Sequence, residues 1–158
     1  NSKIALTSLL LAIGPAQAAV ATTTFTVQIT IAASCTFNSA STLDFGSVGT
    51  LSANVDQTST ISLTCTNTTP YNLGLDVGTG SGATVAVRKM TNGAATVSYS
   101  LYSDSGHSTV CGDTIGTDTV SGTGNGSAQS HTVYGRVPPQ TTPAPNTYSD
   151  TVTATITY

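Results

Sequence analysis

The chain is poor in charge and in the residues that favour helices. Only 7% of its 158 residues are charged, it has no Trp and no Glu, and Lys and Arg together number 4. Since Glu, Lys and Arg are good helix formers, their scarcity disfavours helices. Thr occurs 32 times, and β-branched residues suit strands, where they fill the solvent face of a sheet. The composition therefore predicts an all-β protein.

The scarcity of positive charge excludes two classes of partner. Four basic residues and a net charge of −3 give no electrostatic footprint for nucleic acid or for an anionic membrane surface. We therefore predict no nucleic-acid binding. The apolar content of 38% is enough for an ordered chain, and the length predicts one domain.

Sequence patterns of catalysis are also missing. No Ser lies in G-x-S-x-G, and no Gly-rich run fits a phosphate-binding loop. The acids are seven separate Asp residues, and Asp104, Asp113 and Asp118 lie near Gly or Ser. An Asp in that setting commonly caps its own backbone in a turn, and calcium is the alternative role. We therefore predict no enzyme and no small-molecule cofactor.

Three residues are candidate metal ligands. His107 and Cys111 have the spacing of a metal site, and His131 is the third candidate. Structural zinc prefers four N or S ligands, and only these three remain if the other two cysteines are bridged. We therefore predict no metal site. His131 alternates with Val133, so its expected place is a strand near a sheet edge.

The first eighteen residues differ from the rest of the chain. Lys3 precedes an apolar run over 4–13, and the small residues Ala16 and Ala18 follow. This order is typical of a secretory signal peptide, and the run is too short to span a bilayer. We predict a signal peptide over residues 1–18, with Ala19 as the new N-terminus. The alternative is a buried N-terminal helix.

Export makes a disulfide bond expected, because disulfides persist in oxidising compartments. Cys35 and Cys65 both lie in strand-like contexts, and we predict that they pair. A bridge closing a loop of this length stabilises a fold by about 3.5 kcal/mol on the chain-entropy estimate. Cys111 is then unpaired. It is either a small buried hydrophobe, which is the commoner case, or an intermolecular crosslink.

Apolar residues recur at every second position in several short runs, which places each run on one face of a strand. The runs are Phe25, Val27, Ile29 and Ile31; Ile61, Leu63 and Cys65; Tyr71, Leu73, Leu75 and Val77; Val97, Tyr99 and Leu101; Val133 and Val137; Val152, Ala154, Ile156 and Tyr158. Gly, Asn and Pro separate the runs and supply turn geometry. Many short strands at such spacing indicate a β-sandwich.

Six motifs carry a family resemblance. They are Ser34-Cys35-Thr-Phe, Leu43-Asp-Phe-Gly46, Ile61-Ser-Leu-Thr-Cys65, Ser98-Tyr-Ser-Leu-Tyr-Ser103, Gly135-Arg-Val-Pro138 and Tyr148-Ser-Asp-Thr-Val152. Each is weak alone, but their order and spacing behind a signal peptide resemble the spore coat protein U domain over residues 19–158. That family includes the main subunits of archaic chaperone-usher pili of Gram-negative bacteria.

The resemblance implies an incomplete immunoglobulin-like β-sandwich over residues 35–158, completed by a donor strand from a neighbouring subunit. It implies three partners: identical subunits in a head-to-tail filament, a periplasmic chaperone and an outer-membrane usher. It also implies export through the periplasm to the cell surface, where such a pilus supports attachment and biofilm. The alternative is a stand-alone secreted spore-coat or carbohydrate-binding sandwich. A tip adhesin resembles two domains in series, and the residues after 18 hold one.

The resemblance also implies roles for particular residues. The N-terminal extension, residues 19–34, donates the strand through Phe25, Val27, Ile29 and Ile31. The strand that borders the acceptor groove carries Val152, Ala154, Ile156 and Tyr158. A sandwich that lacks a strand exposes an apolar groove and an unpaired edge, and strand addition removes both liabilities. The alternative is that residues 25–31 pair within their own sandwich.

The chain departs from the family at one point. Family members commonly carry an aromatic residue where Cys111 precedes Gly112 in this sequence. Competition of Cys111 with the predicted Cys35–Cys65 bridge therefore stays open.

Overall fold

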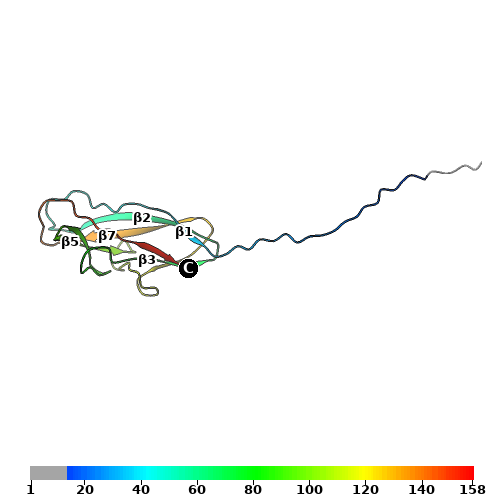
Figure 1. The fold of residues 1–158 in the computed structure, drawn as a ribbon. Helices are drawn as coiled ribbons and strands as arrows, with labels where there is room; N and C mark the ends of the chain where they lie inside the picture. The colour runs from blue at the N-terminus through cyan, green and yellow to red at the C-terminus, as the bar shows by residue number, and fades with distance from the viewer. Residues whose placement is uncertain (1–13) are drawn as a thin grey trace, which may run out of the picture. The chain divides into compact units, whose positions relative to one another are not determined.

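The computed structural model describes residues 14–158, and these residues form eight β-strands (Figure 1). The strands are β1 (Cys35–Ala40), β2 (Val55–Cys65), β3 (Pro70–Leu75), β4 (Arg88–Asn92), β5 (Ala95–Tyr102), β6 (Val120–Thr123), β7 (Ala128–Val137) and β8 (Ala154–Thr157). No helix occurs among the described residues, so none there is long and apolar enough to cross a membrane. The all-β prediction is confirmed.

The chain divides into two units, residues 1–30 and residues 31–158. Residues 1–13 lie outside the described part, and most of the predicted signal peptide lies with them. Residues 14–34 form no strand, and their side chains are exposed. All eight strands belong to the second unit.

The strands form two antiparallel sheets of unequal width. The wider sheet has the order β1-β2-β7-β5-β4, and the narrower sheet has the order β6-β3-β8. The longest ladder joins β2 to β7, from Val55↔Val137 to Thr64↔Ala128. Since the narrower sheet is two strands short of the wider one, it cannot cover the whole inner face of its partner.

The predicted alternation places the core between the sheets. The buried apolar residues are Leu51, Ile61, Leu63, Cys65, Tyr71, Leu73, Leu75, Val97, Tyr99, Leu101, Cys111, Val133 and Val137. Strands β2, β3, β5 and β7 thus each point alternate side chains inward, as period two requires. Val77, which we expected to continue the run of β3, follows the end of that strand and is exposed.

The predicted disulfide bond joins β1 to β2. Cys35 and Cys65 are direct partners in the β1–β2 ladder, and their sulfurs are bonded. Cys111 is a free, buried thiol, and burial raises its pKa. Its 2% exposure fits the interpretation of a small buried hydrophobe and does not favour a crosslink.

A fully buried arginine fixes one end of the sandwich. Arg88 is 0% exposed, and its guanidinium donates hydrogen bonds to the carbonyl oxygens of Leu75, Asp76, Val85 and Cys111 at 2.8–2.9 Å. Burial lowers the pKa of this group. The four carbonyls supply the acceptors that a buried cation requires. Arg88 therefore ties the end of β3 to two loops.

Candidate functional site

An open groove runs along the wider sheet and continues between the two sheets. It consists of two adjoining hollows of about 540 and 450 Å³. Both are lined by Leu43, Asp44, Phe45, Met90, Thr147 and Tyr148. The inner faces of β2, β5 and β7 contribute Ile61, Leu101 and Val133 to the second hollow. We refer to the two hollows together as the inter-sheet groove.

One wall of the inter-sheet groove is the segment 42–49, which follows β1. Leu43 and Phe45 pack closely over β7 at Gly135, where an added Cβ would lie 2.8 Å from Leu43 and 3.0 Å from Phe45. Within the described part of the chain, no main-chain hydrogen bond joins residues 42–49 to another segment. The N–H of Gly46 donates to Asp44 Oδ1 at 2.8 Å, and the other main-chain groups of this wall have no main-chain partner in the described residues.

The opposite wall is β8 with the residues before it. β8 lies at the edge of the narrower sheet and pairs with β3, from Leu75↔Ala154 to Asn72↔Thr157. Its other edge has no partner strand among the described residues. A row of unpaired N–H and C=O groups is a template for a further strand. The groove thus lies between this free edge and the segment 42–49.

The residues that we expected to border the groove are placed along this second wall. Ala154 and Ile156 lie in β8, while Val152 precedes the strand and Tyr158 follows it. Val152, Ala154 and Ile156 are half-buried against the core, whereas the side chain of Tyr158 is 59% exposed. Val152 and Ala154 line the second hollow.

The apolar residues of the predicted donor strand are exposed. Phe25, Val27 and Ile29 are 83–85% exposed, and Ile31 is 73% exposed. They occupy alternate positions, so in a strand they would all point to one face. Complete burial of side chains of this kind stabilises by about 1.5–3 kcal/mol each. This face is therefore a strong candidate for an interaction.

Two carboxylates hold the chain just before β8. Asp150 Oδ1 accepts hydrogen bonds from the main-chain N–H groups of Thr79 (2.7 Å) and Thr151 (2.8 Å) and from the Thr79 hydroxyl (2.8 Å). Asp150 Oδ2 accepts one from the Tyr99 hydroxyl at 2.8 Å. Burial acts to raise the pKa of Asp150, but these hydrogen bonds outweigh it and the pKa is lowered.

The second carboxylate, Asp76, follows β3. Its Oδ1 accepts hydrogen bonds from the N–H groups of Gly78 and Thr153, both at 2.9 Å. Its own N–H donates to the carbonyl of Thr153 at 3.0 Å. Burial acts to raise the pKa of Asp76, but the hydrogen bonds and the nearby Arg88 outweigh it, so that pKa is lowered as well.

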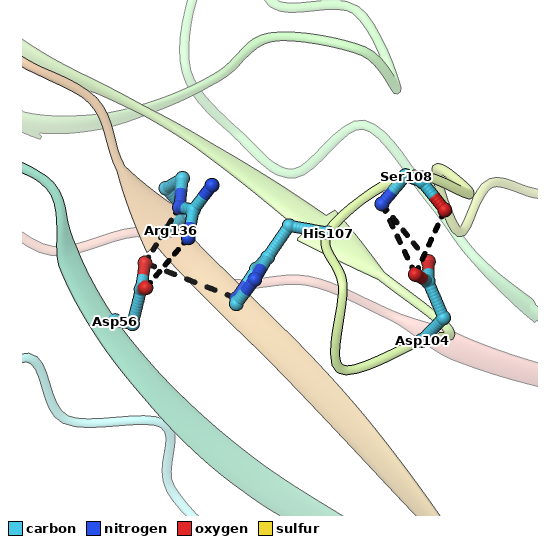
Figure 2. Close-up of polar contacts among 5 residues, drawn as sticks. All are labelled: Asp56, Asp104, His107, Ser108 and Arg136. Atoms are coloured by element: carbon cyan, nitrogen blue, oxygen red, sulfur yellow. Dashed lines mark hydrogen bonds and ion pairs between the residues drawn. The ribbon is translucent and has the colours of Figure 1, made fainter.

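A polar cluster lies away from the groove (Figure 2). Arg136 donates two hydrogen bonds of 2.7 Å to Asp56, and His107 Nε2 lies 3.8 Å from Asp56 Oδ1. Asp104 accepts hydrogen bonds from the N–H and hydroxyl of Ser108. Asp104 thus caps its own loop, as we predicted, and the loop carries His107 over the wider sheet.

The three candidate metal ligands occupy different environments. His107 packs edge-on against Tyr102 and Tyr134. His131 Nε2 lies 2.8 Å from the Tyr71 hydroxyl, and Cys111 is buried beneath Arg88. Within residues 14–158, no group of three His, Cys, Asp or Glu side chains is placed to hold a metal ion.

The fold and the groove define a class of protein. It is a β-sandwich that lacks a strand, with an apolar groove between the unpaired edge of β8 and the segment 42–49. One chain of a solved structure has a similar fold: the CsuC-CsuE chaperone-tip adhesion subunit pre-assembly complex from archaic chaperone-usher Csu pili of Acinetobacter baumannii. The TM-score is 0.57 at 19% identity, over 82% of this chain and 40% of that one. The fold is an incomplete immunoglobulin-like sandwich.

Sequence comparison identifies the family. The family model named Spore Coat Protein U domain matches residues 21–155. Protein U of Myxococcus xanthus is 34% identical over 164 residues, which cover 94% of this chain and 91% of that protein. The chain belongs to the Spore Coat Protein U domain family. The predicted family is therefore confirmed.

Proposed function

We propose that this protein is a structural subunit of an extracellular pilus of the chaperone-usher type. Copies polymerise when the extension of one copy, residues 19–34, enters the inter-sheet groove of the next. The observation that carries the proposal is the match between an exposed, alternating apolar face at 25–31 and an apolar groove bordered by the unpaired edge of β8. A strand laid in that groove buries the face and satisfies that edge.

The energy of such a contact suits a stable filament. Burial of Phe25, Val27, Ile29 and Ile31 at about 1.5–3 kcal/mol each gives roughly 6–12 kcal/mol before any ladder hydrogen bonds. Among related complexes, higher affinity arises mainly from a lower dissociation rate. A contact of this energy is therefore expected to dissociate slowly. One donor and one groove per subunit form a head-to-tail contact, which grows an open filament.

The partners and location follow from this function. An empty groove is an aggregation hazard, so a periplasmic chaperone is expected to occupy it before assembly, and an outer-membrane usher to order the exchange. The similarity to a chaperone-subunit pre-assembly complex supports the chaperone. The subunit is then exported through the periplasm to the surface of a Gram-negative bacterium, where the pilus supports attachment and biofilm.

Two substitutions on opposite faces of the extension test the proposal. Ile29→Asp places a charge on the face that enters the groove, whereas the matched control Gln28→Asp places the same charge on the other face. Since burial of an unpaired carboxylate is strongly unfavourable, we expect Ile29→Asp to abolish polymers and Gln28→Asp to retain them. Electron microscopy and size-exclusion chromatography of exported material measure both outcomes.

Equal polymerisation of the two variants contradicts strand donation. A protein that is monomeric in both variants and in the parent chain indicates a self-complete sandwich. That result favours the stand-alone secreted coat or carbohydrate-binding protein.

A further inference from the structure

We propose that Asp150 and Asp76 are positioning residues that align the acceptor edge of β8. This inference rests on the proposed function, because that edge is where a donor strand pairs. Asp150 lies in the lining of the second hollow, and Asp76 lies outside the lining of both hollows. They act through the main chain of residues 151–153, which leads into β8.

The acceptor edge has little support of its own. β8 has four residues and is an edge strand of the three-stranded sheet, and its only ladder within residues 14–158 is with β3. The residues just before it, Thr151 and Thr153, are exposed and lie outside the strand. Contacts of the residues before β8 therefore contribute to fixing where this short strand begins.

Asp150 supplies the first anchor and connects the two sheets. Its Oδ1 accepts hydrogen bonds from the N–H of Thr151 and from the N–H and hydroxyl of Thr79. Its Oδ2 accepts one from the hydroxyl of Tyr99. Tyr99 belongs to β5 of the wider sheet, and its side chain crosses the groove floor at 5% exposure. The Tyr99–Asp150 bond therefore ties this wall to the wider sheet, next to the main-chain bridge between Ser149 and Thr91 of β4.

The fit around Asp150 is close. Gly78 has φ of +77°, and a Cβ at this position would overlap the Asp150 carboxylate. A side chain at 78 would thus displace the carboxylate as well as strain the turn. The turn after β3 thus packs against the Asp150 carboxylate at Gly78 and leaves no room for a side chain there. This packing restricts the carboxylate to one position.

Asp76 supplies the second anchor and sets the register. Asp76 binds both main-chain polar groups of Thr153. Its side-chain Oδ1 accepts a hydrogen bond from the N–H of Thr153, and its main-chain N–H donates one to the carbonyl of Thr153. This pairing extends the β3–β8 ladder by one position beyond Leu75↔Ala154. A slip of one residue would turn the half-buried Ala154 and Ile156 away from the core.

The test uses the full chain with Val27→Asp and Ile29→Asp, so that its own extension cannot enter a groove. A fluorescent peptide of residues 20–33 is titrated against this parent, and its anisotropy gives a dissociation constant. Hydrogen exchange of the amides of 153–157 is measured without peptide. We expect Asp150→Ala to weaken peptide binding by about tenfold or more, as loss of charge-assisted hydrogen bonds of this strength implies. We expect exchange over 153–157 to quicken by a similar factor.

Two comparisons separate alignment from a general loss of stability. Asp150→Asn keeps one acceptor oxygen but loses the second and the charge, so it should restore part of the peptide affinity and protection. Asp113→Ala removes an exposed Asp and should match the parent in both readouts. Exchange of the β2–β7 amides should stay unchanged in all three variants. If Asp150→Ala fails to fold, the test relies on Asp150→Asn. Its peptide affinity is then expected to be weaker than that of the parent, and its exchange over 153–157 faster.

The outcomes distinguish this inference from the proposed function. Parent-like peptide affinity and parent-like exchange over 153–157 in the Asp150 variants overturn the positioning role. A parent that does not take up the peptide contradicts strand donation. The exchange rates over 153–157 then still decide whether Asp150 positions β8.

Discussion

His131 lies half-buried on β7 with its Nε2 2.8 Å from the hydroxyl of Tyr71. Burial lowers the pKa of His131 below its ordinary value of 6.5. The folded state therefore keeps this imidazole neutral at a pH where the unfolded chain already binds a proton. The contribution of His131 to the free energy of unfolding is complete above the pKa that this residue has in the unfolded chain. It decreases as the pH falls from there towards the lower pKa of the folded state.

A pH titration of stability tests this assignment. Between about pH 7 and about pH 5, we expect the free energy of unfolding of the polymerisation-blocked chain to fall more steeply than that of its His131→Gln variant. One proton sets an upper limit of about 1.4 kcal/mol per pH unit, and partial exposure of the ring reduces it. Urea unfolding at each pH gives both curves, and parallel curves contradict the assignment.

The individual polar residues that matter most were the hardest to predict from the sequence. Asp76 and Arg88 belong to no motif, and Arg88 stands beside Lys89 like a surface residue. Asp150 lies in the motif Tyr148–Val152, but the motif indicated no role for its side chain. Their roles depend on main-chain groups that only the folded loops bring within 3 Å. The pairing of Cys35 with Cys65 was predictable, because both cysteines lie in strand patterns and export favours a bridge.

At the scale of elements, the wall formed by residues 42–49 depends on a glycine. Leu43 and Phe45 lie over β7 because Gly135 leaves room for them. In Gly135→Ala, the new methyl group would meet the ends of both side chains. These ends are able to shift, so we expect the variant to fold with a loss of about 1 kcal/mol and with the wall displaced.

The displaced wall should weaken uptake of the 20–33 peptide severalfold. Gly49→Ala is the matched control, since it lies in the same wall and nothing lies within 4 Å of its added Cβ. Anisotropy titrations of the two variants measure the difference. Equal affinities would mean that residues 42–49 do not shape the acceptor site.

Period-two alternation predicted the strands that carry the core and the edge strand β8, but not β1, β4 and β6, and its run at 25–31 forms no strand in the structure. β2, β3, β5 and β7 each show at least two alternate buried residues. β4 and β6 are short, and apart from the buried Arg88 their residues are half-buried or exposed, so their sequences give no alternating apolar signal. The wall at 42–49 forms no strand at all, and its place depends on contacts with β7 that are distant in sequence.

At the scale of the whole molecule, the proposed function requires a donor segment and an acceptor groove in the same chain. The groove belongs to the compact unit 31–158, whereas most of the segment belongs to the unit 1–30. The sequence predicted the incomplete sandwich only through its family resemblance. Alternation alone fits a complete sandwich as well, because a missing strand leaves no mark on the strands that remain.

Engineered cysteines across the proposed contact test strand donation most directly. Thr26→Cys and Thr155→Cys are combined in one chain, because both residues are exposed and lie on the outward faces of the donor segment and of β8. Oxidation of assembled material should give a ladder of covalent multimers on non-reducing gels. The single variants should give no species beyond a dimer, since Cys111 is buried. A double variant that stays a monomer, with its bridge inside one chain, contradicts strand donation between subunits.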